Sequence, residues 1–338
     1  MYQLIIKFKA LYKVSHTSED YPSDKAIESA IRRWMKRERI SLRRITSKSQ
    51  NTVYEENVMN DFVEFVNMLI SMYDIPDANI VNIDETNVPF SVDSSATYTK
   101  TNSKTVGTKQ ANTSKRATAL LGVTLSGEKL RLFLIFKAQR TERGRVRKEV
   151  KEGIGYADDV DCDVQHNAWV DEEVFIDWIE NVWKPFIKNK SGHFLLLMDQ
   201  FKAHMTSKVL QALSELNTTV LFIPAGYTAK LQVLDVGINM PFKTYNRRQF
   251  EEYMIENMGN DSIIPTRQNV SHWVSSSWKQ IKEEHIINTW RRIGINSNQT
   301  VDWNTVQGEN NYDFDDIQID NVDDNVEFIV ESISDAQD

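Results

Sequence analysis

The chain has 338 residues, of which 41% are hydrophobic and 10% aromatic, enough for a core in one large domain or two ordinary ones. Its single cysteine, Cys162, excludes a disulfide framework and any zinc module built on cysteines, and it fits a reducing compartment. No apolar stretch is long enough to span a membrane, and residues 1–13 show no clear cleavage site.

The net charge of −8 is unevenly distributed along the chain. Residues 309–338 hold 11 acidic residues and no Lys or Arg, which leaves 40 basic against 37 acidic residues in the rest, a net charge of +3. The body is therefore slightly basic, as expected for a protein that contacts nucleic acid. Residues 299–338, with scattered Val, Ile and Phe among their acids, are predicted to be a disordered acidic tail that masks a basic surface or recruits a partner.

Residues 24–48 predict a basic helix near the start of the chain. Ser23 can cap this helix, and apolar residues recur on one face at helical spacing: Ala26, Ile27, Ala30, Ile31 and Trp34. Basic residues on a short helix contact phosphates first and bases second. The candidate DNA contacts are Arg32, Arg33, Lys36, Arg37, Arg43 and Arg44. The alternative is a solvated basic helix that is merely tethered to the rest of the chain.

Short apolar runs separated by helical patterns predict a mixed α/β sheet of five strands flanked by helices. The predicted strands are residues 78–84, 116–125, 129–137, 193–198 and 220–223. Amphipathic stripes predict helices over residues 57–73 and 171–187, and from 239 onward, with a further helical segment over residues 268–294. The charged residues 139–162 predict an irregular, mobile insertion.

Three aspartates stand at the ends of apolar elements that are far apart in the sequence. Asp84 and Asp199 each follow a predicted strand, and Asp235 lies in the first turn of a predicted helix. Carboxylates that gather at a sheet edge repel one another unless a cation or a proton neutralises them. Oxygen ligands favour Mg²⁺ or Mn²⁺, and two such ions are the usual arrangement for phosphodiester chemistry. The alternative for each aspartate taken alone is structural, because strand-end and helix-capping aspartates are common.

These residues stand in motifs that resemble those of pogo/Tigger-type transposases, in the mariner-like group of the DDE superfamily. NIDET at 82–86 resembles the first-aspartate motif, and MDQFKAH at 198–204 resembles the second, with a histidine five residues after its aspartate. IPAGYTAKLQVLDVGINMPFK at 223–243 resembles the run that carries the third acid, 36 residues after the second. Gln200 stands where many members have Asn or Ser, and Val233 replaces the usual Pro, but neither departure removes a carboxylate.

The resemblance implies an RNase H-like fold and four regions. Residues 1–48 would be the remnant of a helix-turn-helix DNA-binding domain, and residues 49–77 a linker helix. Residues 78–298 would form the catalytic domain with its C-terminal helices, and residues 299–338 the acidic tail. Since most of the family's DNA-binding domain does not precede residue 24, we expect the chain to be truncated at its N-terminus.

The resemblance also implies a reaction. Asp84, Asp199 and Asp235 would be the catalytic metal ligands for two Mg²⁺ or Mn²⁺ ions, with His204 as an auxiliary residue. The partners would be DNA, namely transposon terminal repeats and a TA target, with a homodimer as one option and the nucleus as the location. One alternative is a domesticated, non-transposing DNA-binding protein derived from such a transposase, and another is a different RNase H-like nuclease.

Overall fold

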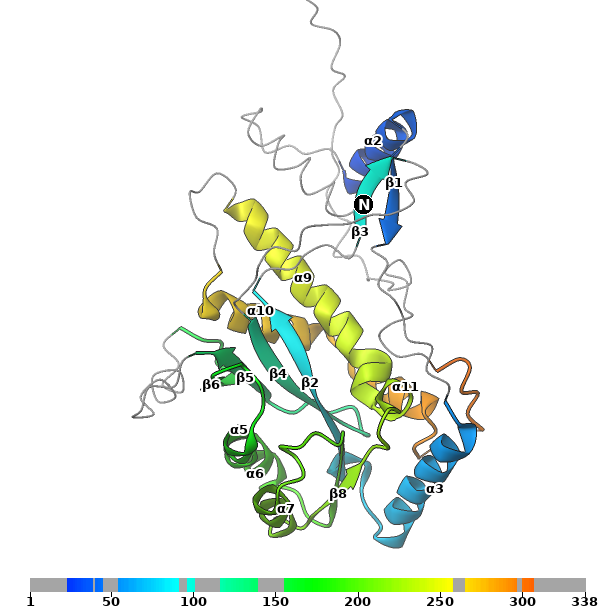
Figure 1. The fold of residues 1–338 in the computed structure, drawn as a ribbon, viewed down its shortest axis with the longest axis vertical. Helices are drawn as coiled ribbons and strands as arrows, with labels where there is room; N and C mark the ends of the chain where they lie inside the picture. Colours follow the sequence, from blue (N-terminus) through cyan, green and yellow to red (C-terminus); the bar gives the residue numbers. More distant parts are fainter. Residues whose placement is uncertain are drawn as a thin grey trace, which may run out of the picture.

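A six-stranded mixed sheet organises the chain in the computed structural model, which describes residues 23–38, 40–44, 54–90, 96–100, 116–138, 155–257, 265–296 and 300–306 (Figure 1). The strands lie in the order β6-β5-β4-β2-β7-β8. β4 is antiparallel to both β2 and β5, whereas the pairs β2–β7, β7–β8 and β5–β6 are parallel. The strands are β2 (Ile80–Pro89), β4 (Arg116–Thr124), β5 (Leu132–Lys137), β6 (Val160–Gln165), β7 (Phe194–Met198) and β8 (Thr218–Phe222).

This topology is the RNase H-like arrangement that the resemblance implied, with β6 added at one edge. The prediction of five strands was wrong in this respect, because residues 160–162 were assigned to the irregular insertion 139–162 and residues 163–165 to no element. Their sequence, VDCDVQ, is half polar, yet Cys162 and Val164 are buried against the sheet. β2 also continues to Pro89, so Asp84 lies within the strand rather than at its end. Residues 139–154 lie outside the described residues.

Helices cover both faces of the sheet (Figure 1). On one face lie α5 (Glu172–Trp178), the π-helical turn η2 (Ile179–Trp183), α6 (Lys184–Ile187) and α7 (Ser207–Ser214). On the other face lie α3 (Glu56–Met72), α8 (Thr228–Leu231), the π-helical turn η3 (Leu234–Ile238), α9 (Asn239–Glu256), α10 (Arg267–Gln280) and α11 (Glu283–Arg292). A short 3-10 turn, η1 (Asp77–Asn79), leads into β2. None of the described helices is long and apolar enough to cross a membrane.

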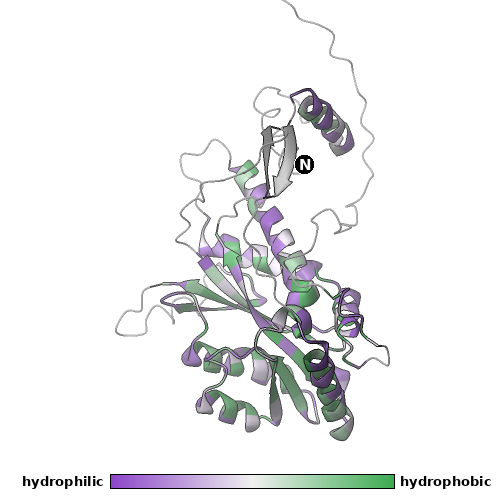
Figure 2. Ribbon diagram, turned by 45° about the vertical axis from the view of Figure 1, so that its right-hand side comes forward, coloured by the Kyte–Doolittle hydropathy of each residue, from purple (hydrophilic) through white to green (hydrophobic). Residues whose placement is uncertain are grey.

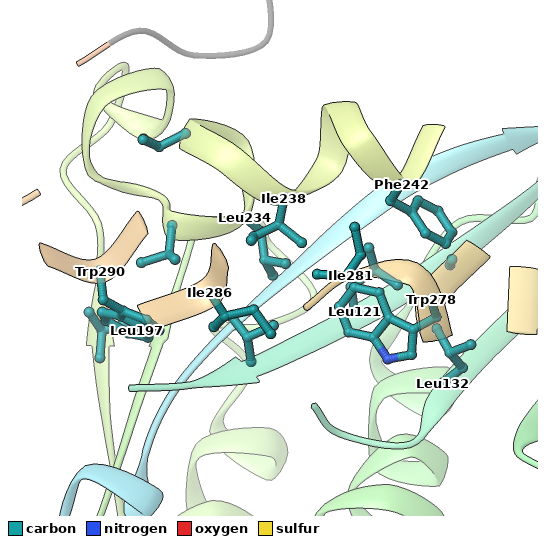
Figure 3. Packing of buried hydrophobic residues seen from close by; sticks show 14 of the residues in the cluster. Leu121, Leu132, Leu197, Leu234, Ile238, Phe242, Trp278, Ile281, Ile286 and Trp290 are labelled. Carbon is teal, nitrogen blue, oxygen red and sulfur yellow. The ribbon is translucent and has the colours of Figure 1, made fainter. Parts of the chain in front are cut away.

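Alternation along the strands builds two hydrophobic layers. Val81 and Ile83 of β2 face the cluster around Trp178 and Trp183, whereas Ile80 faces the cluster around Trp290. Figure 3 shows the second layer, in which Leu234, Phe242, Trp278 and Trp290 pack over Leu121 and Leu197 of the sheet. The strands are largely hydrophobic, whereas the helices carry their hydrophilic residues on the outside (Figure 2). Because side chains alternate between the two faces, the even-numbered residues of β2, including Asp84, lie on the face covered by η3 and α9.

The N-terminal basic segment is a helix followed by a strand. α2 (Asp24–Arg37) begins where Ser23 Oγ accepts a hydrogen bond from Ala26 N at 3.3 Å, as predicted, and it buries Ile27 and Ile31 on one face. The helix ends before residue 40, and β1 (Ile40–Arg44) pairs antiparallel with β3 (Ala96–Lys100). The backbone of Arg43 and Arg44 is therefore extended rather than helical.

Lys129 fixes the end of α10 to the sheet. Its Nζ donates to the carbonyl oxygens of Trp278 and Ile281, both at 2.7 Å, and lies 5.7 Å from the centre of the Trp278 ring. A cation at a helix C-terminus pairs with carbonyls that the helix leaves unbonded. We expect Lys129→Met to lower the free energy of unfolding by about 1–2 kcal/mol. Urea unfolding measures this, with the exposed Lys188→Met as the control; equal stability of the two variants would contradict the assignment.

Candidate active site

Asp84 and Asp235 come from distant parts of the chain and meet at one amide group. Asp84 lies in β2 and Asp235 in η3, and both are half-buried. Asn239 Nδ2, one helical turn after Asp235, lies 2.6 Å from Asp84 Oδ2 and 3.0 Å from Asp235 Oδ1. A single NH₂ group thus donates to both carboxylates and holds them side by side.

Electrostatics disfavours the charged form of Asp84. Burial raises its pKa well above the ordinary value, and the negative charges of Asp235 and Glu85 raise the pKa further. Hydrogen bonds from Asn239 and Gln232 act in the opposite direction and are the weaker effect. The pair is therefore a place where a proton or a cation is needed to neutralise charge.

A buried amide pair fixes η3 against the sheet and so positions Asp235. Asn82 and Gln232 are both fully buried. Asn82 Nδ2 donates to the carbonyl oxygen of Leu197 at 3.0 Å and to Gln232 Oε1 at 2.9 Å, and its Oδ1 accepts from Leu234 N at 3.1 Å. Gln232 Nε2 donates to the carbonyl oxygen of Ile83 at 2.8 Å. These bonds join β2, β7 and the turn before Asp235 in one network.

Gln232→Leu is expected to break this network. Leucine cannot form hydrogen bonds, so Asn82 Nδ2 and the carbonyl oxygen of Ile83 would each lose a buried hydrogen-bond partner. Each such loss costs free energy. We expect a loss of about 2–4 kcal/mol in the free energy of unfolding, measured by urea denaturation. Gln211→Leu, on the surface of α7, is the matched control. A loss below about 1 kcal/mol would show that the network does not hold η3 in place.

Asp199 follows the last residue of β7, and it lies beside Asp84 by register. β2 and β7 are parallel with Asn82 opposite Leu197, so extending the pairing by two residues brings Asp84 to the level of Asp199. The carboxylate of Asp199 is turned toward His204, with 3.0 Å between Asp199 Oδ1 and His204 Nδ1. Phe201 N donates to the same Oδ1 at 3.3 Å.

His204 bridges the two faces of the site. Its ring is 1% exposed, and its Nε2 lies 2.8 Å from Glu85 Oε1 while Nδ1 faces Asp199. Phe175 packs on the ring at 4.7 Å between centroids. Burial alone would lower the pKa of His204, but the charge of Glu85 and hydrogen bonds to both carboxylates outweigh burial and raise the pKa to about 10. The ring is therefore an imidazolium that donates to both acids.

Glu85, Asp199 and His204 form a cluster in which one ligand atom from each residue lies within 4.8 Å of the other two. It is the one such cluster of acids and histidines among the described residues. In the absence of metal, the charges of Glu85 and Asp199 favour the protonated His204 ring, and a metal ion bound to the ring would have to displace that proton. Without metal, the cluster is therefore an internal ion triplet, with His204 as its cation. The three aspartates do not form such a cluster in this structure, so their shared ligation stays a prediction.

The donors around Asp84 suit a hard divalent cation. Asp84 and Asp235 offer carboxylate oxygens, and Asn239 adds an amide oxygen, Oδ1, which is buried and accepts no hydrogen bond from any described residue. An unpaired buried oxygen beside two acids is a group that a bound cation or its water would satisfy. The donor set therefore fits Mg²⁺ or Mn²⁺. Asp199, just past the end of the adjoining strand β7, stays the predicted third acid.

The predicted DNA-binding residues lie apart from the acids in sequence. Arg32, Arg33, Lys36 and Arg37 are exposed on α2. Arg32 pairs with Glu28 at 2.5 Å, and Arg37 pairs with Glu38 at 2.9 Å, so part of this charge is matched locally. The side chains of Arg43 and Arg44 lie outside the described residues.

Four residues of the site were not singled out from the sequence: Asn82, Glu85, Gln232 and Asn239. Each stands inside one of the quoted motifs, next to or near an aspartate. The available signal was a polar side chain within an otherwise apolar buried run, as in VNID and KLQVLD. Buried amides in such runs need partners, and the sequence does not show which partners they find.

Comparisons with known proteins agree with these motifs. A family model described as "DDE superfamily endonuclease" matches residues 114–290, just over half of the chain. The mouse protein "Pogo transposable element with KRAB domain" is 26% identical over 281 residues, covering 79% of this chain and 44% of that protein. "CENP-B homolog protein 2" of Schizosaccharomyces pombe is 27% identical over 264 residues, covering 75% and 47%. The chain thus spans less than half the length of either relative.

Among solved structures, the chain is similar to "Crystal structure of the mariner Mos1 paired end complex with Mg", with a TM-score of 0.44 and 12% identity. That alignment covers 86% of this chain and 75% of the Mos1 chain. The catalytic domain of Mos1 alone aligns with a TM-score of 0.37 and 14% identity, covering 72% of this chain and 92% of that domain.

Proposed function

The chain belongs to the DDE superfamily of endonucleases, and from that membership we propose that it is a transposase-type nuclease that cuts and joins DNA with divalent metal ions. The single observation that carries the proposal is the pair Asp84 and Asp235, held on one amide of Asn239 while the charge of Asp84 is strongly disfavoured. A structural acid pair would gain more from an arginine or lysine between its members. This pair is surrounded by oxygen donors and amides, which is the setting of a cation site.

In this proposal, Asp84, Asp199 and Asp235 hold two Mg²⁺ or Mn²⁺ ions. When bound, such ions supply charge stabilisation for the attacking and leaving oxygens of a phosphodiester. Asn239 keeps Asp84 and Asp235 at a fixed separation, and the Asn82–Gln232 network keeps η3 in register with the sheet. His204 orients Asp199 by donating to its Oδ1, and it matches the charge of Glu85 on the opposite face.

The DNA in this proposal comprises transposon ends and a TA target. Exposed cations on α2 would contact phosphates, which positions DNA without reading its sequence. The similarity to proteins named for pogo transposable elements and for CENP-B supports DNA as the ligand. The nucleus is the compartment in which this reaction would take place, and a homodimer would let one complex act on two ends.

A second candidate is a DNA-binding protein that no longer cuts. The observation that favours it is the orientation of Asp199, whose carboxylate is held by His204, while the ligand atoms of the three aspartates do not all lie within 4.8 Å of one another. If that contact persists in the presence of metal, the third acid is missing and cleavage fails. DNA binding through α2 would be unaffected.

A nicking assay separates the two candidates. Purified protein is incubated with supercoiled plasmid, with and without pogo-type terminal repeats, in Mn²⁺, in Mg²⁺ or in a chelator. The nuclease proposal predicts nicked or linear product with either metal, none with the chelator, and none with a folded Asp199→Ala variant. DNA binding by gel shift with no metal-dependent product would support the non-cutting candidate and overturn the nuclease.

A further inference from the structure

The loop that follows β6 presents an exposed tryptophan between two buried residues. Trp169 is 55% exposed, whereas Ala168 before it and Val170 after it are 0% and 4% exposed. Ala168 has a backbone φ of 58°, in the left-handed region that residues other than glycine rarely adopt. The loop therefore accepts backbone strain to bury the neighbours and leave the indole outside.

Hydrogen bonds hold this loop in one conformation. Gln165 Oε1 accepts from Asn167 N at 2.6 Å and from Trp169 N at 3.3 Å, and Gln165 Nε2 donates to Asp171 Oδ2 at 3.2 Å. Asp171 in turn caps α5 by accepting from Val174 N at 3.0 Å. A large apolar ring on a fixed loop binds a flat partner at a low cost in conformational entropy.

Arg116 supports the ring with a positive charge. Its guanidinium lies 5.9 Å from the centre of the Trp169 ring and donates to the carbonyl oxygen of Asn167, from Nε at 3.2 Å and from Nη2 at 3.1 Å. Two further cations lie along the same edge: Lys137, which is paired with Gln165 in the sheet, and Arg267, which donates to the carbonyl oxygen of Lys137 at 3.1 Å. None of these three cations forms an ion pair with an acid among the described residues.

The loop lies at a distance from the acids that DNA can span. Arg116 is opposite Pro89 at the end of β2, and Asp84 is opposite Leu121, five residues further along β4. Five strand residues extend about 17 Å, which is about five base steps of a nucleic acid strand. Side chains alternate along β4, so Arg116 lies on the face of the sheet that α5 covers and Asp84 on the other face. A DNA strand that leaves the acids around the end of β2 would therefore pass the cations beside Trp169.

We propose that Trp169 and Arg116 form a stacking site for one unpaired nucleobase, with Lys137 and Arg267 contacting the neighbouring phosphates. This inference rests on the proposed DNA function and adds a base-binding position to it. An aromatic ring beside unpaired cations is the combination that binds single-stranded nucleic acid. A protein partner is disfavoured because the exposed residues that precede the tryptophan in the loop, His166 and Asn167, are polar. One ring also falls far short of the area that a stable protein interface buries.

The test compares three DNA duplexes that differ at one position. The first is fully paired, the second carries a single bulged 2-aminopurine, and the third carries an abasic site at the bulge. The full chain is titrated with each duplex in the presence of a chelator, which prevents cleavage. We expect binding to the bulged base to be about 5- to 100-fold tighter than binding to the abasic bulge, with quenching of the 2-aminopurine fluorescence.

Variants assign the effect to the tryptophan. Trp169→Ala should reduce the ratio of the two affinities to about one, and Trp169→Phe should retain most of it, because a phenyl ring still stacks. Tyr73→Ala removes an aromatic residue that is 52% exposed and stacks on His193 just before β7, and it should leave the ratio unchanged. Thermal unfolding of each variant checks that the fold is intact.

Each other outcome has a distinct meaning. If the wild-type chain binds paired DNA but binds the bulged base and the abasic bulge equally well, the stacking site is overturned and the proposed function still stands. A ratio that survives in Trp169→Ala would also overturn the site, because the base must then bind elsewhere. Absence of binding to all three duplexes would overturn both the proposed function and this inference.

Discussion

Asp84→Asn is expected to lower the rate of metal-dependent DNA cleavage by at least about 10³-fold, equivalent to about 4 kcal/mol of transition-state stabilisation. The same change should raise the free energy of unfolding of the metal-free protein by about 1–3 kcal/mol. The reason is that the asparagine removes a buried charge beside Asp235 and Glu85 but keeps an oxygen that accepts from Asn239. Activity and stability should therefore move in opposite directions.

The pH dependence of this stability difference has a definite sign. The pKa of Asp84 is higher in the folded state than in the unfolded state, so the folded protein binds the extra proton at low pH and loses that advantage as the pH rises. The gain from Asp84→Asn should be larger at pH 8 than at pH 5 when metal is absent. Urea unfolding at both pH values measures it, with the exposed Asp61→Asn as the control. A variant less stable than the wild type at pH 8 would contradict the electrostatic account of the pair.

His204→Ala is expected to lower the free energy of unfolding by about 3–5 kcal/mol, because it leaves two partly buried carboxylates without the cation between them. His204 is the group that both Glu85 and Asp199 contact, and its ring also packs on Phe175. In the nuclease proposal His204 orients Asp199, so loss of the ring would leave this carboxylate unoriented, and cleavage should fall even at temperatures where the variant remains folded.

His204→Gln separates the two effects. The amide can still donate to one carboxylate but carries no charge, so we expect an intermediate loss of stability and partial activity. His272→Ala, an exposed histidine whose Nε2 lies 3.3 Å from the carbonyl oxygen of Gly155, is the matched control and should change the stability by less than about 0.5 kcal/mol. If His204→Ala were as stable as His272→Ala, the description of an ion triplet would be wrong.

Strongly apolar elements were predictable from the sequence because periodicity alone identifies them. Residues 193–198 and 116–125 were predicted as strands and are β7 and β4 within a residue or two at each end. β6 was missed because its two aspartates gave it the composition of a loop, although one of them, Asp163, is fully buried in the strand. The end of β2 was placed too early for the same reason, since the polar residues after Ile83 still pair with β4.

The site was predictable only in part. The motifs pointed to the three aspartates, and the structure brings Asp84 and Asp235 together on Asn239. The partners that hold them could not be predicted, because Asn82 and Gln232 lie 150 positions apart and meet only through the register of β2 with η3. The turn of Asp199 toward His204 is a choice of side-chain rotamer, which no spacing in the sequence determines.

Titration with Mn²⁺, followed by electron paramagnetic resonance or calorimetry, tests most directly whether the three aspartates bind divalent cations together. The proposed site predicts that the wild-type chain binds Mn²⁺ and that Asp84→Asn, Asp199→Asn and Asp235→Asn each weaken binding by at least about tenfold. Glu85→Gln should leave Mn²⁺ binding within a few-fold of the wild type. If instead Asp84→Asn and Asp235→Asn bind Mn²⁺ normally while Glu85→Gln does not, the cation belongs to the cluster around His204, and the proposed active site is wrong.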